Sequence, residues 1–321
     1  MKKFDVVALG ELLIDFTDNG ISNQGNTVFE ANPGGAPCNV LSMLNKLGHK
    51  TAFIGKIGND IFGHRLKILL EENLIDTSNL LMDDKVRTTL AFVETKKDGD
   101  RDFSFYRNPG ADMMLREDEI KDDLLTSTKI FHFGTLSMTH EEVRKATKKA
   151  VVTAKKAGAL ISFDPNLREP LWESLELAHK QVEYGLSQCD ILKISDNEIT
   201  WFTGEKDYTT GIKKLLKEYK IPLILLSMGK DGSRSYYKDS IVETKAFLQK
   251  ETIETTGAGD TFGGCCLHYI LQNGLENLTD KNLEEMLIYS NAAASIITTR
   301  RGALRVMPTP EEISNFLSTN M

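Results

Sequence analysis

Residues 130–163, IFHFGTLSMTHEEVRKATKKAVVTAKKAGALISF, decide the fold. Two short apolar runs, Ile130–Phe133 and Leu160–Phe163, flank a segment of helical period, Glu141–Lys156, which stops at Ala157-Gly158. A strand, a helix and a second strand in this order are typical of an α/β fold with a mostly parallel sheet covered by helices. The same alternation predicts further strands at Val6–Leu9, Ala52–Ile54, Ile191–Ile194 and Leu223–Ser227, and further helices at Asn39–Leu47, Phe62–Glu72, Leu171–Ser187 and Gly211–Lys220.

Two stretches, residues 12–32 and 88–106, break this alternation of buried strands and helices. In them polar and apolar residues alternate, and a Lys97-Asp98-Gly99-Asp100 turn divides the second stretch. Alternation predicts strands with one wetted face, so we expect a small separate sheet that forms a lid over a ligand site. No linker interrupts the chain, and we expect residues 1–321 to form a single domain with this lid.

The composition argues against several classes of protein. The 321 residues include 39 Lys+Arg and 46 Asp+Glu, a net charge of 39 − 46 = −7, and no basic stripe that would bind nucleic acid. Asp5 and Glu11 interrupt the first apolar stretch, so we expect neither a signal peptide nor a membrane span there. The four cysteines have no CxxC spacing, which predicts reduced thiols in a cytoplasmic protein. The alternative is a redox pair at Cys265-Cys266.

Several common phosphate-binding and catalytic motifs are absent. Gly58–Gly63 has the glycine spacing of a P-loop, but His64-Arg65 follow where Lys and Ser or Thr are required. No GxGxxG run follows the first expected strand, which disfavours a nicotinamide-dependent oxidoreductase. His140-Glu141 lacks the second histidine of a zinc protease, and no GxSxG nucleophile elbow occurs.

The motif that carries chemistry is TTGAGD, residues 255–260, directly before an expected helix that begins at Thr261. The small residues Gly257-Ala258-Gly259 at a helix N-terminus would leave backbone N–H groups free to bind an anion, with phosphate the favoured candidate. Asp260 in the same turn would repel phosphate unless it takes part in the reaction. In phosphoryl transfer it would accept the proton of the attacking hydroxyl. The structural alternative is an N-cap aspartate after a glycine-rich turn.

A second glycine-rich run, NPGGAPCNV at residues 32–40, accompanies the TTGAGD run. Together they resemble the two signatures of the ribokinase-like (PfkB-type) carbohydrate kinases, and the resemblance is strongest to fructokinase-like members. It extends along almost the whole chain through Gly10–Asp15, Tyr106–Asp112, Asp164–Arg168 and Lys193–Glu198. It implies a three-layer αβα sandwich with a mostly parallel central sheet and a small β lid.

The resemblance also implies roles for the matching residues. Asp260 would be the catalytic base, and Gly257, Ala258 and Gly259 would form the anion hole. Carboxylates and amides bind sugar hydroxyls well, and a guanidinium suits a phosphate. The residues that would bind the substrate or lie near the transferred phosphate are Asp15, Gly34, Gly35, Asn39, Arg107, Asn166 and Arg168. The alternatives are a plain turn at Gly34-Gly35 and a surface ion pair at Arg107.

ATP, Mg²⁺ and K⁺ are the cofactors that the resemblance implies. Glu198 would organise the Mg²⁺ of MgATP through water, although Ser195 stands where ribokinases have Asn. Glu254, where most relatives have Asp, and Thr256 would help to hold K⁺, and the longer Glu side chain leaves K⁺ activation open. The residues on the nucleotide side would be Lys193, Ser227, Gly229, Gly232 and Asn291. A hairpin turn at Gly229 and Gly232 is the alternative for those two.

The sequence thus predicts a cytoplasmic ATP-dependent sugar kinase, with fructose as the favoured acceptor. The rival acceptors are 2-keto-3-deoxygluconate and a nucleoside or aminoimidazole riboside. A catalytically silent sugar or nucleotide sensor is the non-enzyme alternative, although this chain keeps both Asp260 and the glycine turn. We expect small-molecule partners only, apart from a homodimer formed through the apolar face of the lid.

Overall fold

The computed structural model describes residues 2–95 and 101–320, so the predicted Lys97–Asp100 turn lies outside the described residues. The strands are β1 (Phe4–Leu9), β2 (Leu13–Ile21), β3 (Thr27–Gly34), β4 (Thr51–Gly58), β5 (Ile75–Asp83), β6 (Leu90–Thr95), β7 (Arg101–Tyr106), β8 (Thr128–Gly134), β9 (Leu160–Asp164), β10 (Ile191–Ser195), β11 (Leu223–Ser227), β12 (Ser233–Tyr237) and β13 (Ser240–Thr244). The α-helices are α1 (Ala36–Lys46), α2 (Ile61–Glu72), α3 (Asp122–Thr126), α4 (Glu141–Lys156), α5 (Leu175–Gln188), α6 (Asp196–Thr203), α7 (Tyr208–Glu218), α8 (Ala258–Asn273), α9 (Asp280–Ile297) and α10 (Pro310–Asn320).

The main sheet of the described chain has nine strands in the order β13-β12-β11-β10-β9-β8-β1-β4-β5. The strands from β11 to β5 in this order are parallel, and β12 and β13 are antiparallel additions at one edge. All six predicted strands belong to the parallel part, which confirms the predicted fold class. The sequence pattern misses β5, β12 and β13, because polar residues interrupt these strands near the two edges of the sheet.

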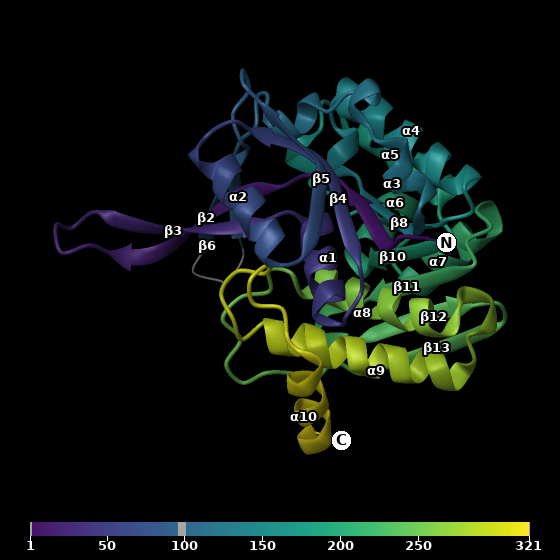
Figure 1. The fold of residues 1–321 in the computed structure, drawn as a ribbon. Coiled ribbons are helices and arrows are strands. Elements are labelled where there is room, and N and C mark those ends of the chain that lie inside the picture. Colours follow the sequence, from purple (N-terminus) through teal and green to yellow (C-terminus); the bar gives the residue numbers. More distant parts are fainter. Residues whose placement is uncertain (1, 96–100, 321) are drawn as a thin grey trace.

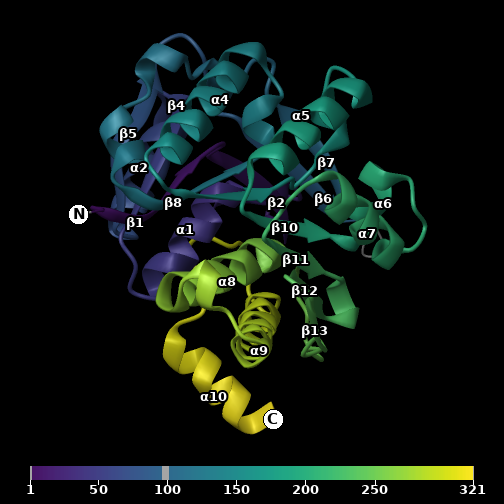
Figure 2. The same cartoon turned by 90° about the vertical axis from the view of Figure 1, so that its right-hand side faces the viewer.

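Helices cover both faces of the main sheet and complete three layers (Figure 2). Apolar residues of α4, α5, α6 and α7 pack in a core on one face. Those of α1, α2, α8 and α9 pack in cores on the other face. The helix predicted from Leu171 begins later, at Leu175, because the Ser174 side chain caps it by accepting a hydrogen bond from the Leu177 amide.

The two alternating stretches form the predicted second sheet, with strand order β3-β2-β6-β7. This lid sheet projects from the body of the molecule, with the β2–β3 hairpin reaching furthest (Figure 1). Its outer face carries aromatic side chains, including Phe16 stacked on Phe92 with ring centroids 4.9 Å apart. Because side chains alternate along a strand, the neighbouring residues Asp15, Thr17 and Val93 point to the opposite, inner face.

Two further observations concern features expected from the sequence. Within residues 2–95 and 101–320 the structure contains no helix that is both long and apolar enough to span a membrane. All four cysteines are buried free thiols, so Cys265 and Cys266 do not form a disulfide.

Candidate active site

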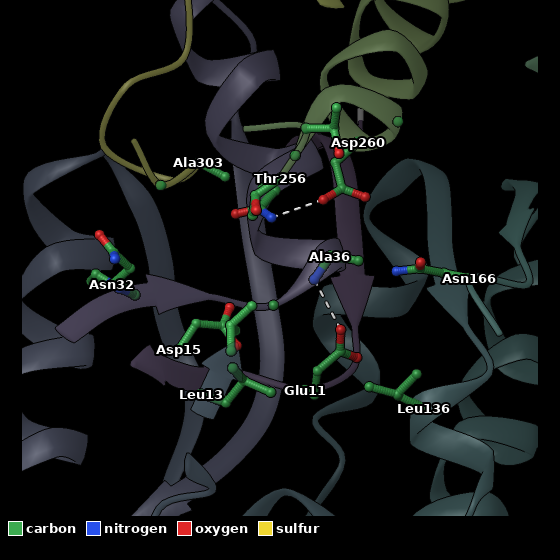
Figure 3. A pocket seen from close by; sticks show the side chains of 18 of the residues that line it. Glu11, Leu13, Asp15, Asn32, Ala36, Leu136, Asn166, Thr256, Asp260 and Ala303 are labelled. Atoms are coloured by element: carbon green, nitrogen blue, oxygen red, sulfur yellow. Dashed lines mark hydrogen bonds between the residues drawn. The ribbon is translucent and has the colours of Figure 1, made fainter. Parts of the chain in front are cut away.

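A cavity of about 350 Å³ lies where the inner face of the lid sheet meets the N-termini of α1 and α8. In Figure 3, Asp260 from α8 lies on one side of this cavity, opposite Glu11 and Asp15, and Asn166 approaches from the flank. The sequence-predicted residues that line it are Asp15, Gly35, Asn39, Asn166, Arg168, Lys193, Glu254, Thr256, Gly257, Gly259 and Asp260. The sequence therefore identifies eleven of the 23 residues that line the cavity.

The TTGAGD run forms a tight turn that starts α8 earlier than predicted. Gly257 is the N-cap, with a left-handed φ of 75°, and α8 begins at Ala258 instead of Thr261. A Cβ atom at position 257 would lie 2.6 Å from the Cβ of Ala303, so only glycine fits this turn without a shift. Asp260 is consequently the third residue of the helix, and the N-cap alternative for it is wrong.

The turn presents backbone amides to the cavity, with one change from the prediction. The first four N–H groups of a helix have no acceptor within the helix. The Ala258 amide donates to the Thr255 carbonyl oxygen at 3.2 Å and is already engaged. The predicted anion hole would therefore consist of the backbone amides of Gly257, Gly259 and Asp260, without the amide of Ala258.

Asp260 is a partly buried carboxylate of this cavity, and α1 supplies its hydrogen-bond donor. The Asn39 Nδ2 donates to Asp260 Oδ2 at 2.8 Å. Burial raises the pKa of Asp260, against the lowering effects of the Asn39 hydrogen bond and the charges of Lys193 and Arg168. A carboxylate with a raised pKa is a better proton acceptor than an ordinary aspartate.

Asn39 has a second polar atom that awaits a partner. Its Oδ1 is buried and has no hydrogen-bond partner among the described residues. Buried polar atoms are normally hydrogen-bonded, and leaving one without a partner costs free energy. A ligand hydroxyl that donates to this oxygen would remove that cost.

Two cations flank the amides of α8. The Lys193 Nζ lies 3.1 Å from the position that a Cβ on Gly259 would occupy. Arg168 lines the same wall, and its Nη1 donates to the Leu167 carbonyl oxygen at 3.0 Å. The cations and the amides together make this part of the cavity suited to a phosphate group.

The lid side of the cavity is polar at one edge and apolar at the other. Strand pairing sets Asp15 of β2 opposite Asn32 of β3. Gly34 does not line the cavity, but a Cβ there would lie 2.5 Å from Asp15 Oδ2, so this glycine makes room for the carboxylate. The apolar residues on this side are Leu13, Val93 and Phe105, and Leu136 adds an apolar side chain from the main body. Hydroxyl-binding groups beside an apolar surface suit a sugar ring.

The comparisons with known proteins agree with this geometry. The model of the pfkB family carbohydrate kinases matches residues 3–310. The chain belongs to this family. Probable fructokinase-2 of Arabidopsis thaliana is 42% identical over 97% of this chain and 95% of its own length.

Solved structures of bacterial kinases share the whole fold. Fructokinase from Xylella fastidiosa with bound ATP is 28% identical and superimposes with a TM-score of 0.90, covering 100% of this chain and 99% of the other. A double mutant of fructokinase from Vibrio cholerae O395, bound to fructose, ADP and a potassium ion, is 26% identical with a TM-score of 0.88 and covers 99% of each chain.

Several cavity residues of this family member are not predicted from its sequence. Asn32 and Thr17 line the lid side, where Asn32 Nδ2 donates to Thr17 Oγ1 at 2.8 Å. Thr17 follows Leu13 and Asp15 at the period of a strand, and this alternation is the signal that could identify it. Glu11 accepts a hydrogen bond from the Ala36 amide at 2.9 Å and so caps α1 from outside the helix. Burial raises the pKa of Glu11 to about 7.

Arg107 does not line the cavity, and its substrate contact stays a prediction. Its guanidinium is 7% exposed and donates from Nε to Asp112 Oδ2 at 2.8 Å. It also donates from Nη1 to Thr139 Oγ1 and from Nη2 to the carbonyl oxygen of Leu136, a cavity residue. The alternative of a surface ion pair is wrong, because the pair with Asp112 is buried and supports the cavity wall from behind.

Four residues predicted for the nucleotide side lie outside this cavity, namely Ser227, Gly229, Gly232 and Asn291. Ser227 ends β11, and the turn of Gly229 and Gly232 joins β11 to its antiparallel neighbour β12. The Met228 amide donates to the Gly232 carbonyl oxygen at 2.9 Å, which confirms the hairpin alternative. The Asn291 Nδ2 donates to Thr244 Oγ1 at 2.9 Å and to the Lys245 carbonyl oxygen at 3.1 Å, so it anchors the chain that follows β13.

The two acidic residues predicted near metal ions have protein donors of their own. Glu198 accepts hydrogen bonds from the Leu167 amide at 2.9 Å and from the Ser195 amide and hydroxyl at 2.9 and 2.8 Å. Ser195 thereby forms a capping box with Glu198 at the start of α6. Glu254 lines the cavity, and its Oε1 accepts a hydrogen bond from the Gly302 amide at 2.7 Å.

Proposed function

We propose that this chain is an ATP-dependent fructokinase. The observation that carries the proposal is the partly buried Asp260 carboxylate, held by Asn39 beside the N-terminal amides of α8 at the base of a sugar-sized cavity. The fructokinase names of the relatives and of the solved structures described above favour fructose over other acceptors.

The cavity supports direct transfer of the γ-phosphoryl group to a sugar hydroxyl. Asp15 on the lid and the unpartnered Oδ1 of Asn39 would hold the sugar. Asp260 accepts the proton of the attacking hydroxyl, which makes the oxygen a stronger nucleophile. The amides of the α8 turn and the Lys193 ammonium stabilise negative charge on the transferred group. The lid excludes water, which would otherwise compete as the acceptor.

The residues present fit Mg²⁺ that is carried mainly by ATP. Among the described residues, the structure shows no cluster of three or more His, Cys, Asp or Glu side chains suited to hold a metal ion. Both oxygens of Glu198 already accept protein hydrogen bonds, so this carboxylate fits a contact through water better than a direct bond. Mg²⁺ commonly keeps several waters and binds through substrate phosphates. When bound, it neutralises charge on the phosphates.

We propose that K⁺ binds near Glu254 and Thr256, where the loop before α8 meets the loop around Gly302. A bound cation would fix the two loops relative to the amides of the α8 turn. Replacing K⁺ in the assay by tetramethylammonium, which is too large for such a site, should lower kcat by about tenfold, as expected when a binding site loses its preorganisation. The measurement is steady-state kcat at constant ionic strength. Equal rates in the two salts would eliminate the site.

The pH dependence of kcat/KM should report Asp260. Only the ionised carboxylate accepts a proton, so activity should rise with pH through the pKa of Asp260 and then reach a plateau. Because burial raises this pKa, the acidic limb should lie above the value of about 3.9 for an ordinary aspartate. A rate profile from about pH 4 to 8 measures it. A flat profile would contradict the assignment of the base.

A coupled assay of ADP release tests the substrate. Fructose, 2-keto-3-deoxygluconate, ribose and nucleosides are offered as separate acceptors at equal concentration, and fructose should give the highest kcat/KM. A higher value for another acceptor would reassign the substrate and keep the kinase chemistry. If none of these acceptors leads to ADP release, the catalytically silent sensor is favoured.

We further propose a cytoplasmic homodimer that forms through the outer face of the lid sheet. Four aromatic side chains, Phe16, Phe29, Phe92 and Tyr106, cluster on this face. Phe29 and Tyr106 are 44% and 67% exposed. A cluster of exposed aromatic side chains is typical of an interaction surface. A second copy would cover them. The four buried free thiols support a reducing compartment.

A further inference from the structure

Asp164 is a buried acidic residue that the proposed mechanism does not use. It is the last residue of β9, it is 4% exposed, and it does not line the active-site cavity. Substrate in the cavity therefore does not reach it. An isolated buried carboxylate is costly, so its partners indicate its purpose.

Its charged partner is Lys193, which does line the cavity. The parallel register of β9 and β10 pairs Leu192 with Phe163, so the next residues on the two strands, Lys193 and Asp164, are neighbours. Lys193 Nζ and Asp164 Oδ2 lie 3.0 Å apart, with side-chain exposures of 12% and 6%. The other oxygen, Oδ1, accepts a hydrogen bond from the Asn166 amide at 3.2 Å. The carboxylate is thus fixed to the backbone on one side and to the ammonium on the other.

This ion pair aims the ammonium at the α8 turn. The Nζ atom lies 3.1 Å from where a Cβ on Gly259 would be, so it sits beside a residue of the proposed anion hole. A lysine side chain has four rotatable bonds, and holding its end at one point needs a fixed partner. Burial lowers the pKa of Lys193, but the carboxylates of Asp164, Glu198 and Asp260 outweigh burial and raise it, so the ammonium stays charged.

We propose that Asp164 is a positioning residue, which holds the Lys193 ammonium over the α8 turn where it contacts the transferred phosphoryl group. This inference rests on the proposed kinase function and adds a residue to it. Asp164 acts through Lys193 and has no contact of its own with the substrate. Removing the Asp164 carboxylate should therefore lower kcat only while Lys193 is present.

A double-mutant cycle tests this coupling. The variants are D164N, K193M and D164N/K193M, each assayed for fructose-dependent kcat and for binding of ATP and of adenosine by calorimetry. K193M should lower kcat by about 100-fold, because it removes one preorganised charge from the phosphoryl site. D164N should lower kcat by about tenfold in the wild-type background and by less than about twofold in the K193M background. Equal losses in both backgrounds would overturn the proposal.

The binding measurements separate positioning from a general loss of structure. ATP should bind about tenfold more weakly to D164N and to K193M, whereas adenosine, which has no phosphate, should bind all variants equally. A loss of adenosine affinity equal to that of ATP would also overturn the proposal. D164N alone would unfold if Lys193 needs its partner for folding. In that event K193M and the double variant still test the proposal, because their kcat values should agree.

A matched control comes from a second ion pair, with a buried lysine, whose residues do not line the cavity. Lys56 Nζ lies 2.6 Å from Glu119 Oε1, with side-chain exposures of 5% and 17%. E119Q should lower the melting temperature without changing the ratio of ATP to adenosine affinity; a changed ratio would contradict a specific effect at Asp164. Failure of the kinase proposal itself would appear differently, as wild-type enzyme that releases no ADP with any sugar.

Discussion

Replacing Asp260 by asparagine should lower kcat by about 10³-fold, the scale that a well-placed general base supplies. Asparagine has nearly the same shape, and its Oδ1 can still accept the hydrogen bond that Asn39 Nδ2 donates at 2.8 Å. The cavity should therefore keep its geometry and lose only the proton acceptor. ATP affinity, measured by calorimetry, should change by less than about threefold because the phosphate-binding amides stay in place.

Stability separates this loss from unfolding. Burial raises the pKa of Asp260 above that of the unfolded chain. A raised carboxyl pKa means that the group favours folding below its unfolded pKa and that this contribution is lost as pH rises through the folded pKa. At neutral pH the ionised carboxylate therefore destabilises the fold. The D260N variant should melt at or above the wild-type temperature, and near-normal turnover in it would refute the mechanism.

The central fold follows from the sequence because apolar runs and helical periods coincide there. The stretch from Ile130 to Phe163 forms β8, α4 and β9, with α4 spanning the predicted Glu141–Lys156. At the edges the signal fails, since β12 contains two serines and an arginine among five residues. A strand at the edge of a sheet does not need a continuous apolar run.

Within the site, residue types and motifs predict which residues lie at the cavity better than they predict the hydrogen-bond partners of those residues. The motifs place Asp260 and Lys193 at the cavity, yet they do not show that the Ala258 amide is engaged by the Thr255 carbonyl. They also cannot reveal that Arg107 is paired with Asp112 behind the wall, because a guanidinium serves a ligand or a buried carboxylate equally well. These contacts depend on how distant segments pack.

The net charge of −7 contrasts with a site for a polyanion. Local charge resolves the contrast, because Lys193 and Arg168 flank the positive end of the α8 dipole within one cavity. The long-range field of the acidic exterior is screened over about 8 Å in physiological salt, so it has little influence on a buried phosphate site. Binding therefore depends on a few groups at the turn.

Replacing Gly257 by alanine should disrupt this turn and lower kcat by about 100-fold, the effect of losing a preorganised oxyanion donor. Its φ of 75° is strained for an L-residue, and the new methyl group would lie 2.6 Å from the Cβ of Ala303. Gly263 provides the matched control in the same helix, because a Cβ there meets no atom within 4 Å. G263A should keep wild-type kcat and melt slightly higher, since alanine favours a helix by about 1 kcal/mol over glycine.

A second substitution separates the two causes of the G257A defect. A303G removes the colliding Cβ and leaves the strained φ, so the G257A/A303G variant should recover part of the lost kcat while remaining below the wild type. The turn must move as a unit, because Gly259 and Asp260 follow Gly257 within one helical turn and their amides shift with it. Wild-type kcat in G257A would show that the amides of the turn do not stabilise the transferred phosphoryl group.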